Sequence, residues 1–342
     1  MPCNTLSSNV LQALQYFQYF DFSQNLIAVL TKKTKREKTS RKKSKKLFIK
    51  KKNHKERGGN KKTFVLSNKY YQPSYIRTSF NFNCKIIVKV ISFMNNKGGV
   101  GKTTSVQNVG YHIARKGYRT LLIDLDPQSN LSQAFGLEDK EVSIYECLSD
   151  ENRKVLLADA VNVINENLHV IPSVLQLSTA EIDLINRFSR ESILKKLLEG
   201  IADQYDFVFL DCPPSMGILT INALAATDYV FVPLQAEFFS FKGIDSLNLF
   251  ITKVQQQINP RLALNGVFMT MYKKQQNLSL SVRQTVKDFF GDKLLQTVVR
   301  VNVALSESQS QAQPIFEYAP DSNGAEDYKA LAEEILEILQ KP

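Results

Sequence analysis

The sequence predicts an α/β fold in which a doubly wound, mainly parallel sheet carries helices on both faces. Short apolar runs rich in β-branched and aromatic residues alternate with longer segments of helical periodicity, which is the pattern of βαβ units. A glycine-rich segment also follows the first run and opens an amphipathic segment, in the order strand, tight loop, helix. Such units join by right-handed crossovers and bind ligands at the carboxyl ends of the strands. The expected strands are 86–93, 120–124, 207–211, 229–233 and 264–270, with breaks at Gly117, Pro172 and Asn323-Gly324.

Charge divides the chain into two regions. Residues 1–84 contain 19 Lys and Arg against 3 Asp and Glu, whereas residues 85–342 contain 25 against 30, so the net charge of +11 comes from the first region alone. We expect 1–84 to be a basic, disordered extension, because its lysine-rich part has too few apolar residues to form a core. Residues 85–342 are long enough for one α/β domain and are mildly acidic.

Three interpretations of the extension remain open: a DNA-binding arm, a dispensable tail, or a segment that is not translated in the native protein, with a start near Val88. Residues 10–30 are too polar for a membrane span, and their basic run follows the apolar part instead of preceding it, so we expect no export signal. The scattered cysteines show no zinc-binding spacing and favour a reduced, cytoplasmic location.

The loop after the first strand predicts a nucleoside triphosphate site. Glycines permit positive φ and close approach of the main chain, so successive N–H groups can converge on phosphate oxygens, and the following helix adds its positive dipole end. Lys102 supplies a cation for the β and γ phosphates, and the Thr103 hydroxyl is placed to ligate Mg²⁺. The residues expected to contact the nucleotide are Lys97, Gly98, Gly99, Val100, Gly101, Lys102, Thr103 and Thr104.

This loop departs from the general phosphate-loop pattern at two positions. Asn96 stands where the first glycine is usual, and Lys97 adds a second lysine five residues before Lys102. A tightly wrapped loop favours different targets for the two ammonium groups, and the nucleotide of a second subunit is the obvious target for Lys97. The segment from Lys97 to Thr104 resembles the deviant Walker A family of ATPases, whose K-G-G-V-G-K-T-T box it matches at every position.

Two further strand ends carry carboxylates. Asp124 and Asp126 close a buried strand and leave it on the same side if the strand geometry persists, although Pro127 argues that the strand stops there. Asp211 follows the apolar run 207–210 and precedes two prolines, as a Walker B aspartate does. We expect Asp211 to hold Mg²⁺ through water, and the pair 124/126 to order the magnesium shell and the attacking water.

The order of these segments over residues 86 to 340 resembles the ParA/Soj partition ATPases. The resemblance implies that ATP and Mg²⁺ close a sandwich dimer in which Lys97 reaches the partner's nucleotide, while Lys102 and Asp126 support hydrolysis. It further implies non-specific DNA binding, release on slow hydrolysis, a ParB-like stimulating partner, a cytoplasmic or nucleoid-associated location and no membrane partner. Asn302, in the segment T-V-V-R-V-N-V-A-L-S-E, falls on the position that contacts adenine in the family.

DNA binding is the weakest implication of the resemblance. Gln275, Val301 and Ala304 stand where the family has arginines, and the domain itself is not basic. A basic patch could be rebuilt from scattered residues, which are Lys273, Lys274, Arg283, Lys287, Lys293 and Arg300.

Three alternatives belong to other classes. A MinD-like ATPase that positions cargo other than DNA shares the loop, but the acidic terminal helix 325–339 would be repelled by anionic lipid. An iron–sulfur reductase would need Cys147 or Cys212 at a dimer interface, and a DNA-binding protein with negligible hydrolysis also fits. The sequence leaves the cargo and the stimulating partner unidentified.

Overall fold

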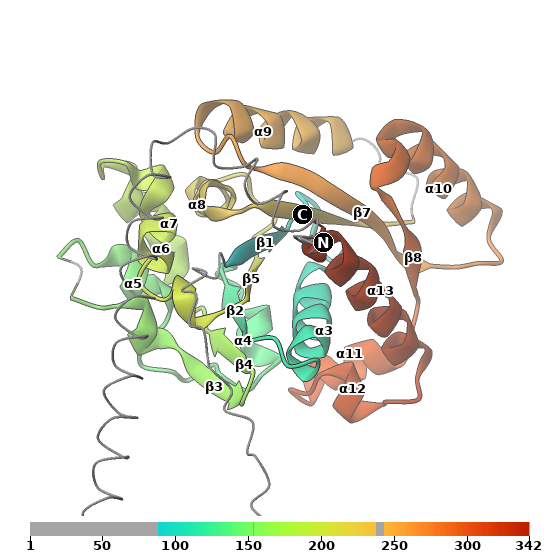
Figure 1. The fold of residues 1–342 in the computed structure, drawn as a ribbon, viewed down its shortest axis with the longest axis horizontal. Helices are drawn as coiled ribbons and strands as arrows, with labels where there is room; N and C mark the ends of the chain where they lie inside the picture. The colour runs from blue at the N-terminus through green and yellow to red at the C-terminus, as the bar shows by residue number, and fades with distance from the viewer. Residues whose placement is uncertain (1–87, 153, 237–242, 342) are drawn as a thin grey trace, which may run out of the picture. The chain divides into compact units, whose positions relative to one another are not determined.

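The computed structural model describes residues 88–152, 154–236 and 243–341 (Figure 1). The predicted extension 1–84 lies outside these residues, so its boundary stays a prediction. The described chain alternates strands with helices, as the sequence predicts.

The sheet has eight strands in the order β3-β4-β2-β5-β1-β6-β7-β8. All neighbouring pairs are parallel except β3 and β4, which form an antiparallel pair at one edge. The fold class predicted from the sequence is therefore confirmed. The strands are β1 (Lys89–Phe93), β2 (Thr120–Asp124), β3 (Asn162–Asn165), β4 (Leu168–Ile171), β5 (Phe207–Asp211), β6 (Tyr229–Gln235), β7 (Ala263–Tyr272) and β8 (Leu294–Arg300).

The five predicted strands correspond to β1, β2, β5, β6 and β7, whereas β3, β4 and β8 were not predicted. The missed strands lie toward the two edges of the sheet. There β3 alternates half-buried and exposed residues and β8 is only partly buried, so neither forms the continuous apolar run that marks a central parallel strand.

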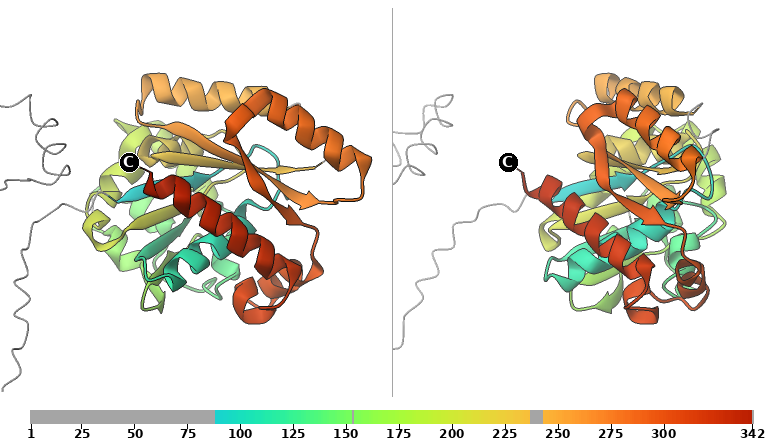
Figure 2. Two further views of the ribbon diagram at one scale, coloured as in Figure 1. Left: turned by 45° about the vertical axis from the view of Figure 1, so that its right-hand side comes forward. Right: turned by 90° about the vertical axis from the view of Figure 1, so that its right-hand side faces the viewer.

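Helices cover both faces of the sheet (Figures 1 and 2). Alternate side chains of each central strand point to opposite faces: Val208 and Leu210 of β5 join one core, and Phe207 and Phe209 join the other. The first core packs against α5 (Ile144–Ser149), α6 (Leu177–Ile185), α7 (Ile193–Leu198), α8 (Ile218–Ala226), α9 (Ile244–Gln257) and α10 (Asn277–Phe290). The second packs against α3 (Lys102–Arg115), α4 (Asn130–Gln133), α11 (Val303–Ser310), α12 (Ile315–Tyr318) and α13 (Asn323–Gln340).

The second core is centred on aromatic residues from four adjacent strands. The Phe93 ring lies 6.1 Å from that of Phe209, 5.8 Å from that of Phe231 and 6.0 Å from that of Phe268, measured between ring centroids. All four are fully buried. Phe93 immediately precedes the glycine-rich loop, so this cluster anchors the strand from which the loop departs.

One predicted break falls inside a helix. Asn323 and Gly324 form the first turn of α13, and Ser322 caps that helix by accepting a hydrogen bond from the N–H of Ala325 at 3.2 Å. A side chain at position 324 would clash with Leu305 of α11, because its Cβ would lie 2.9 Å from Leu305 Cγ. The glycine therefore allows α11 and α13 to approach closely. Figure 2 shows α13 crossing the face of the sheet beside α3.

Candidate functional site

The loop between β1 and α3 has the backbone geometry of a phosphate cradle. Gly99 and Gly101 have φ values of 70° and 85°, in the left-handed region that favours glycine, whereas Gly98 does not. Gly101 caps the N-terminus of α3 without a side-chain hydrogen bond, so the first N–H groups of this helix face the loop. A side chain at position 101 would also contact Thr270, whose Cγ2 would lie 3.6 Å from the added Cβ.

Lys102, the first residue of α3, is held under this loop. Only 7% of its surface is exposed, and its Nζ donates a hydrogen bond to the Lys97 carbonyl at 3.2 Å. Burial lowers the pKa of the Lys102 ammonium, while the charges of Asp211 and Asp126 act in the opposite direction. The side chain is thus desolvated before any ligand arrives, which strengthens its attraction for an anion.

The carboxylate of Asp211 at the end of β5 lacks partners. The side chain is fully buried, and neither oxygen accepts a hydrogen bond of good geometry from the described residues. Burial raises the pKa of Asp211 well above its usual range, with a further contribution from Asp124; the nearby Thr103 hydroxyl and Lys102 favour the ionised form. A buried carboxylate left without donors beside a threonine hydroxyl suits a hydrated Mg²⁺, which needs oxygen ligands and retains waters. Asp211 and Thr103 therefore fit the predicted metal role.

The two carboxylates at the end of β2, Asp124 and Asp126, have different surroundings. The strand ends at Asp124, and the Asp124 side chain is enclosed by protein donors instead of facing the pocket. Asp126 lines the pocket and accepts a hydrogen bond from the N–H of Gln128 at 3.0 Å. Of this pair, only Asp126 is placed to contact a ligand.

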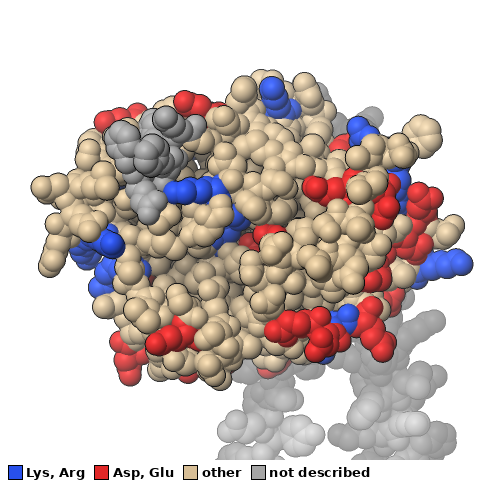
Figure 3. Space-filling view, turned by 180° about the vertical axis from the view of Figure 1, so that it is seen from behind, with Lys and Arg blue, Asp and Glu red and all other residues tan. Residues whose placement is uncertain are grey.

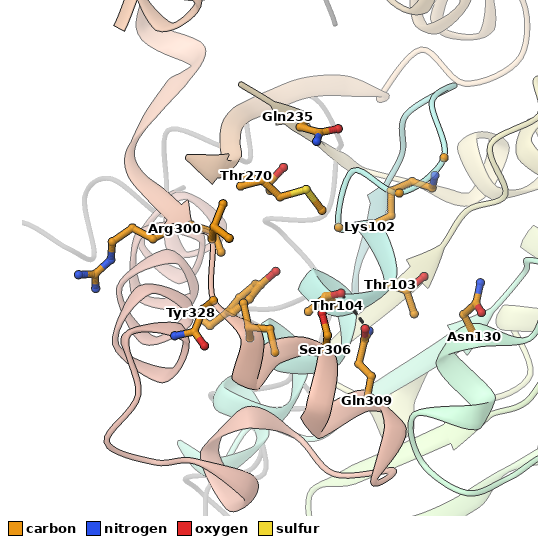
Figure 4. Close-up of a pocket in the computed structure, with 18 of the residues that line it drawn as sticks. Lys102, Thr103, Thr104, Asn130, Gln235, Thr270, Arg300, Ser306, Gln309 and Tyr328 are labelled. Carbon is orange, nitrogen blue, oxygen red and sulfur yellow. Dashed lines mark hydrogen bonds between the residues drawn. The ribbon is translucent and has the colours of Figure 1, made fainter. Parts of the chain in front are cut away.

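A pocket of about 1020 Å³ opens beside these groups (Figure 4). Its phosphate end is lined by Gly98, Gly99, Gly101, Lys102, Thr103, Thr104 and Asp126. Its opposite end is lined by residues from β7, β8, α11 and α13, including Thr270, Arg300, Asn302, Ser306, Gln309 and Tyr328. A cavity of this size accommodates a nucleotide.

Residues far apart in the sequence join the two ends of the pocket. Gln309 of α11 donates from Nε2 to the Thr104 hydroxyl at 2.9 Å, the contact dashed in Figure 4. Thr270 of β7 donates to the Val100 carbonyl at 2.9 Å. Sequence reasoning missed Gln309 and Thr270, because no local pattern marks a residue whose partner lies about two hundred positions away.

Asn302 reaches the pocket from the start of α11. Its Oδ1 accepts a hydrogen bond from the N–H of Ala304 at 2.9 Å, so it caps the helix. The amide nitrogen of Asn302 makes no hydrogen bond to the described residues and can serve a base. This placement suits the predicted adenine contact without testing it.

Lys97 occupies a different position from Lys102. It is half-buried, its N–H donates to the Asn95 side chain at 2.9 Å, and its carbonyl accepts from Lys102. It is not among the residues lining the pocket. Of the two lysines of the loop, Lys102 lines the pocket and Lys97 does not.

Arg300 is held by two acidic residues of α13, which removes it from the residues that could form a basic patch. Its guanidinium donates to Asp327 at 2.6 and 2.9 Å and also pairs with Glu326, and its N–H donates to Asp327 at 2.8 Å. These bonds raise the pKa of Arg300, and the side chain turns away from the pocket toward α13 (Figure 4). On the face shown in Figure 3, Lys and Arg side chains stand in separate small groups among neutral and acidic residues.

The alternative sites find little support in the described residues. Cys147 and Cys212 are both buried, so neither is presented for a bridge between subunits. Among these residues no cluster of three His, Cys, Asp or Glu side chains forms a metal site, and no helix is long and apolar enough to cross a membrane.

Comparison with known proteins identifies relatives over this same region. A family model described as an AAA domain matches residues 88–264. The sporulation initiation inhibitor protein Soj of Bacillus subtilis is 44% identical over 249 residues, which cover 72% of this chain and 98% of that protein. The chromosome-partitioning ATPase Soj of Treponema pallidum is 42% identical over 250 residues, which cover 72% of this chain and 97% of that protein.

The fold also matches solved structures. A crystal structure of cobyrinic acid a,c-diamide synthase from Mycobacterium smegmatis, with a bound ATP analogue and magnesium, superposes with a TM-score of 0.65 and 32% identity. The match covers 75% of this chain and 97% of that one. A fold of this type thus holds nucleotide and magnesium together.

Proposed function

We propose that this chain, which belongs to the ParA/Soj family of partition ATPases, is an ATP-operated switch that dimerises around its nucleotide and segregates DNA. The observation that carries the proposal is a desolvated Lys102 at the glycine-rich loop, with the charge of the buried Asp211 acting on it and neither Asp211 oxygen accepting a hydrogen bond of good geometry from the described residues. Charges arranged this way are costly to bury unless a ligand completes the site.

In this proposal each part of ATP is held by a different set of residues. The loop amides from Gly98 to Thr104 and the ammonium of Lys102 take the phosphates, Thr103 and Asp211 hold Mg²⁺, and Asn302 takes the base. Bound magnesium would neutralise developing charge on the β and γ phosphates. Asp126, exposed to the pocket, orients the attacking water, so hydrolysis depends on positioning and electrostatics.

Dimerisation depends on Lys97 in this proposal. Its side chain does not line the pocket of its own subunit, which supports a target on the nucleotide of a second copy. Lys97→Ala should abolish ATP-dependent dimerisation and leave the monomer folded, as measured by light scattering with and without ATP. Lys116→Ala, which removes a lysine from the far end of α3, is the matched control. A dimer that persists in Lys97→Ala would reject the cross-subunit role.

The proposed cycle also requires DNA. The dimer binds DNA non-specifically and leaves it after hydrolysis, a ParB-like protein stimulates turnover, and the protein resides in the cytoplasm at the nucleoid. With Arg300 committed to α13, affinity for DNA must come from the remaining lysines and Arg283, or from residues 1–84. A MinD-like role in positioning other cargo is the second candidate, but Glu326, Glu333, Glu334 and Glu337 make α13 acidic and unsuited to anionic lipid.

ATPase assays with Mg²⁺, run with and without DNA and a ParB-like partner, test both the hydrolysis and the proposed DNA cargo. We expect slow basal hydrolysis, retention on DNA only with ATP, and faster hydrolysis when DNA and a ParB-like partner are both present. A hydrolysis rate that does not change when DNA is added would favour the MinD-like role. Failure to bind ATP at all would overturn the proposal.

A further inference from the structure

Asp124 is a buried carboxylate that the proposed chemistry does not use. It is fully inaccessible to solvent, and the register of the sheet pairs it with Asp211 on the adjacent strand β5. Two carboxylates buried side by side repel each other, so the protein must gain something from the second. The hydrogen bonds of Asp124 show what that is.

Both oxygens of Asp124 are occupied by donors. Oδ1 accepts from the N–H of Asp126 at 3.1 Å. Oδ2 accepts from the N–H of Ser132 at 2.9 Å and from its hydroxyl at 2.7 Å. The Ser132 hydroxyl in turn accepts from the N–H of Ser173, just beyond β4, at 2.8 Å. Asp124 therefore ties together the segment that carries Asp126, the short helix α4 and the end of β4.

That segment needs an external restraint. Ser129, immediately before α4, has a φ of 51°, which a residue with a side chain adopts only when its surroundings impose it. α4 has only four residues, too few to be stable alone. The bonds of Asp124 fix both ends of the turn, at Asp126 and at Ser132. Asp126, at the first of these ends, lines the pocket.

We propose that Asp124 is a positioning residue for hydrolysis, which fixes the turn 125–132 through Ser132 and so holds the Asp126 carboxylate in the pocket. The proposal rests on the proposed ATPase function. Asp124 itself is fully buried and is not among the residues that line the pocket, so its proposed role is exerted through the turn. A chain lacking this restraint binds ATP but leaves Asp126 misplaced.

The experiment compares two buried serines in the full-length chain. Ser132→Ala removes a hydroxyl that donates to a carboxylate beside Asp126, whereas Ser143→Ala removes one that donates to Glu146 at 2.6 Å, at the start of α5. Both serines are fully buried. Single-turnover hydrolysis with Mg²⁺ and the dissociation constant of a fluorescent ATP analogue are measured for each, with Asp124→Asn as the stronger variant.

Hydrolysis should fall about tenfold in Ser132→Ala, the order of one lost hydrogen bond to a charged group. In Asp124→Asn it should fall about 100-fold, the order that a misplacement of about 1 Å costs. The dissociation constant should stay within about twofold in both, because only the chemical step is affected. Ser143→Ala should hydrolyse ATP at the wild-type rate.

Each other outcome contradicts a defined claim. Wild-type hydrolysis in Ser132→Ala, or an equal loss in Ser143→Ala, overturns the positioning role while leaving the ATPase function intact. Weakened nucleotide binding in Ser132→Ala without a slower chemical step overturns it as well. A wild-type protein that binds no ATP refutes the function on which the inference rests.

Discussion

The two ends of the pocket differ in how their charged side chains are paired. At the phosphate end, Lys102 is buried with one carbonyl partner and Asp211 has no donor of good geometry among the described residues. At the opposite end, Arg300 is bound on several sides by Asp327 and Glu326. The charged groups of the phosphate end are therefore available for a ligand, whereas Arg300 at the opposite end holds β8 against α13 through its ion pairs. Substitutions at the first should therefore change chemistry, and substitutions at the second should change stability.

The largest effect is expected at the phosphate end. Lys102→Ala removes the buried cation that faces the phosphates, and hydrolysis should fall at least about 100-fold, the range found when one preorganised charge-stabilising donor is lost. The free energy of unfolding of the nucleotide-free protein should change less than that for Arg300→Ala, since the buried ammonium donates one hydrogen bond, to the Lys97 carbonyl, and the described residues hold it in no ion pair. Steady-state ATPase assays and urea unfolding measure the two quantities. A variant that loses stability but keeps hydrolysis would reverse the comparison.

Titration of the phosphate end should appear as a pH dependence of stability. Burial raises the pKa of Asp124 to about 6 despite the Ser132 hydrogen bonds, whereas the usual value is 3.8. The folded state therefore binds more protons than the unfolded state between these values, so this group contributes stability below about pH 4 that is lost as pH rises through 6. Two pKa units correspond to about 3 kcal/mol.

The measurement is the slope of the unfolding free energy against pH, compared between the wild type and each variant. In urea titrations from pH 3 to 7 without nucleotide, Asp124→Asn should show a smaller decline than the wild type, the remainder coming from Asp211, whose pKa burial also raises. Glu333→Gln provides a control of opposite sign, because Lys116 lowers the pKa of Glu333 and that stabilisation is instead lost as pH falls below 4.5 toward the folded value. Identical slopes in wild type and Asp124→Asn would contradict the prediction.

The sequence pointed to most of the residues that gather at the phosphate end of the pocket, and to fewer of those at the opposite end. Gly99, Lys102 and Thr103 lie within one loop and helix start, and Asp211 ends a strand whose apolar run is visible without the fold, so local patterns suffice. Gln309 gives no such signal, because its role depends on a contact with Thr104 of α3, a helix on the same face of the sheet but 205 positions away in the sequence.

Other features could not be read from the sequence for a related reason. Arg300 was considered as one of several residues that could form a basic patch, but it pairs with Glu326 and Asp327, 26 and 27 positions away on α13, and no sequence pattern indicates that pairing. Asp124 and Asp126 were expected to work together at the metal. The chain leaves the strand after Asp124, and that single departure gives the two carboxylates different surroundings.

A substitution at the opposite end of the pocket should lower the free energy of unfolding. Arg300→Ala leaves the carboxylate of Asp327, which is 8% exposed, without its guanidinium partner, although the N–H of residue 300 still donates to it. We expect a loss of about 2 kcal/mol in the free energy of unfolding, below the full cost of breaking a buried ion pair because Arg300 is partly exposed. Hydrolysis per folded molecule should stay near wild type. A loss of hydrolysis without a loss of stability would show that Arg300 acts on the nucleotide after all.

The smallest effect belongs to the contact that joins the two ends. Gln309→Ala removes a neutral hydrogen bond to Thr104, worth about 1 kcal/mol. Because both residues line the pocket, we expect roughly fivefold weaker ATP binding, together with a loss in the unfolding free energy of at most about 1 kcal/mol, smaller than that of Arg300→Ala. Ser308→Ala on the same helix, whose hydroxyl donates only to the Leu305 carbonyl and does not line the pocket, is the matched control. Titration with a fluorescent ATP analogue distinguishes the two. If Gln309→Ala instead lowers the unfolding free energy as much as Arg300→Ala does and leaves ATP affinity unchanged, then Gln309 of α11 stabilises the fold and does not contribute to nucleotide binding. The part of the pocket that binds ATP would then be limited to residues nearer the phosphate loop.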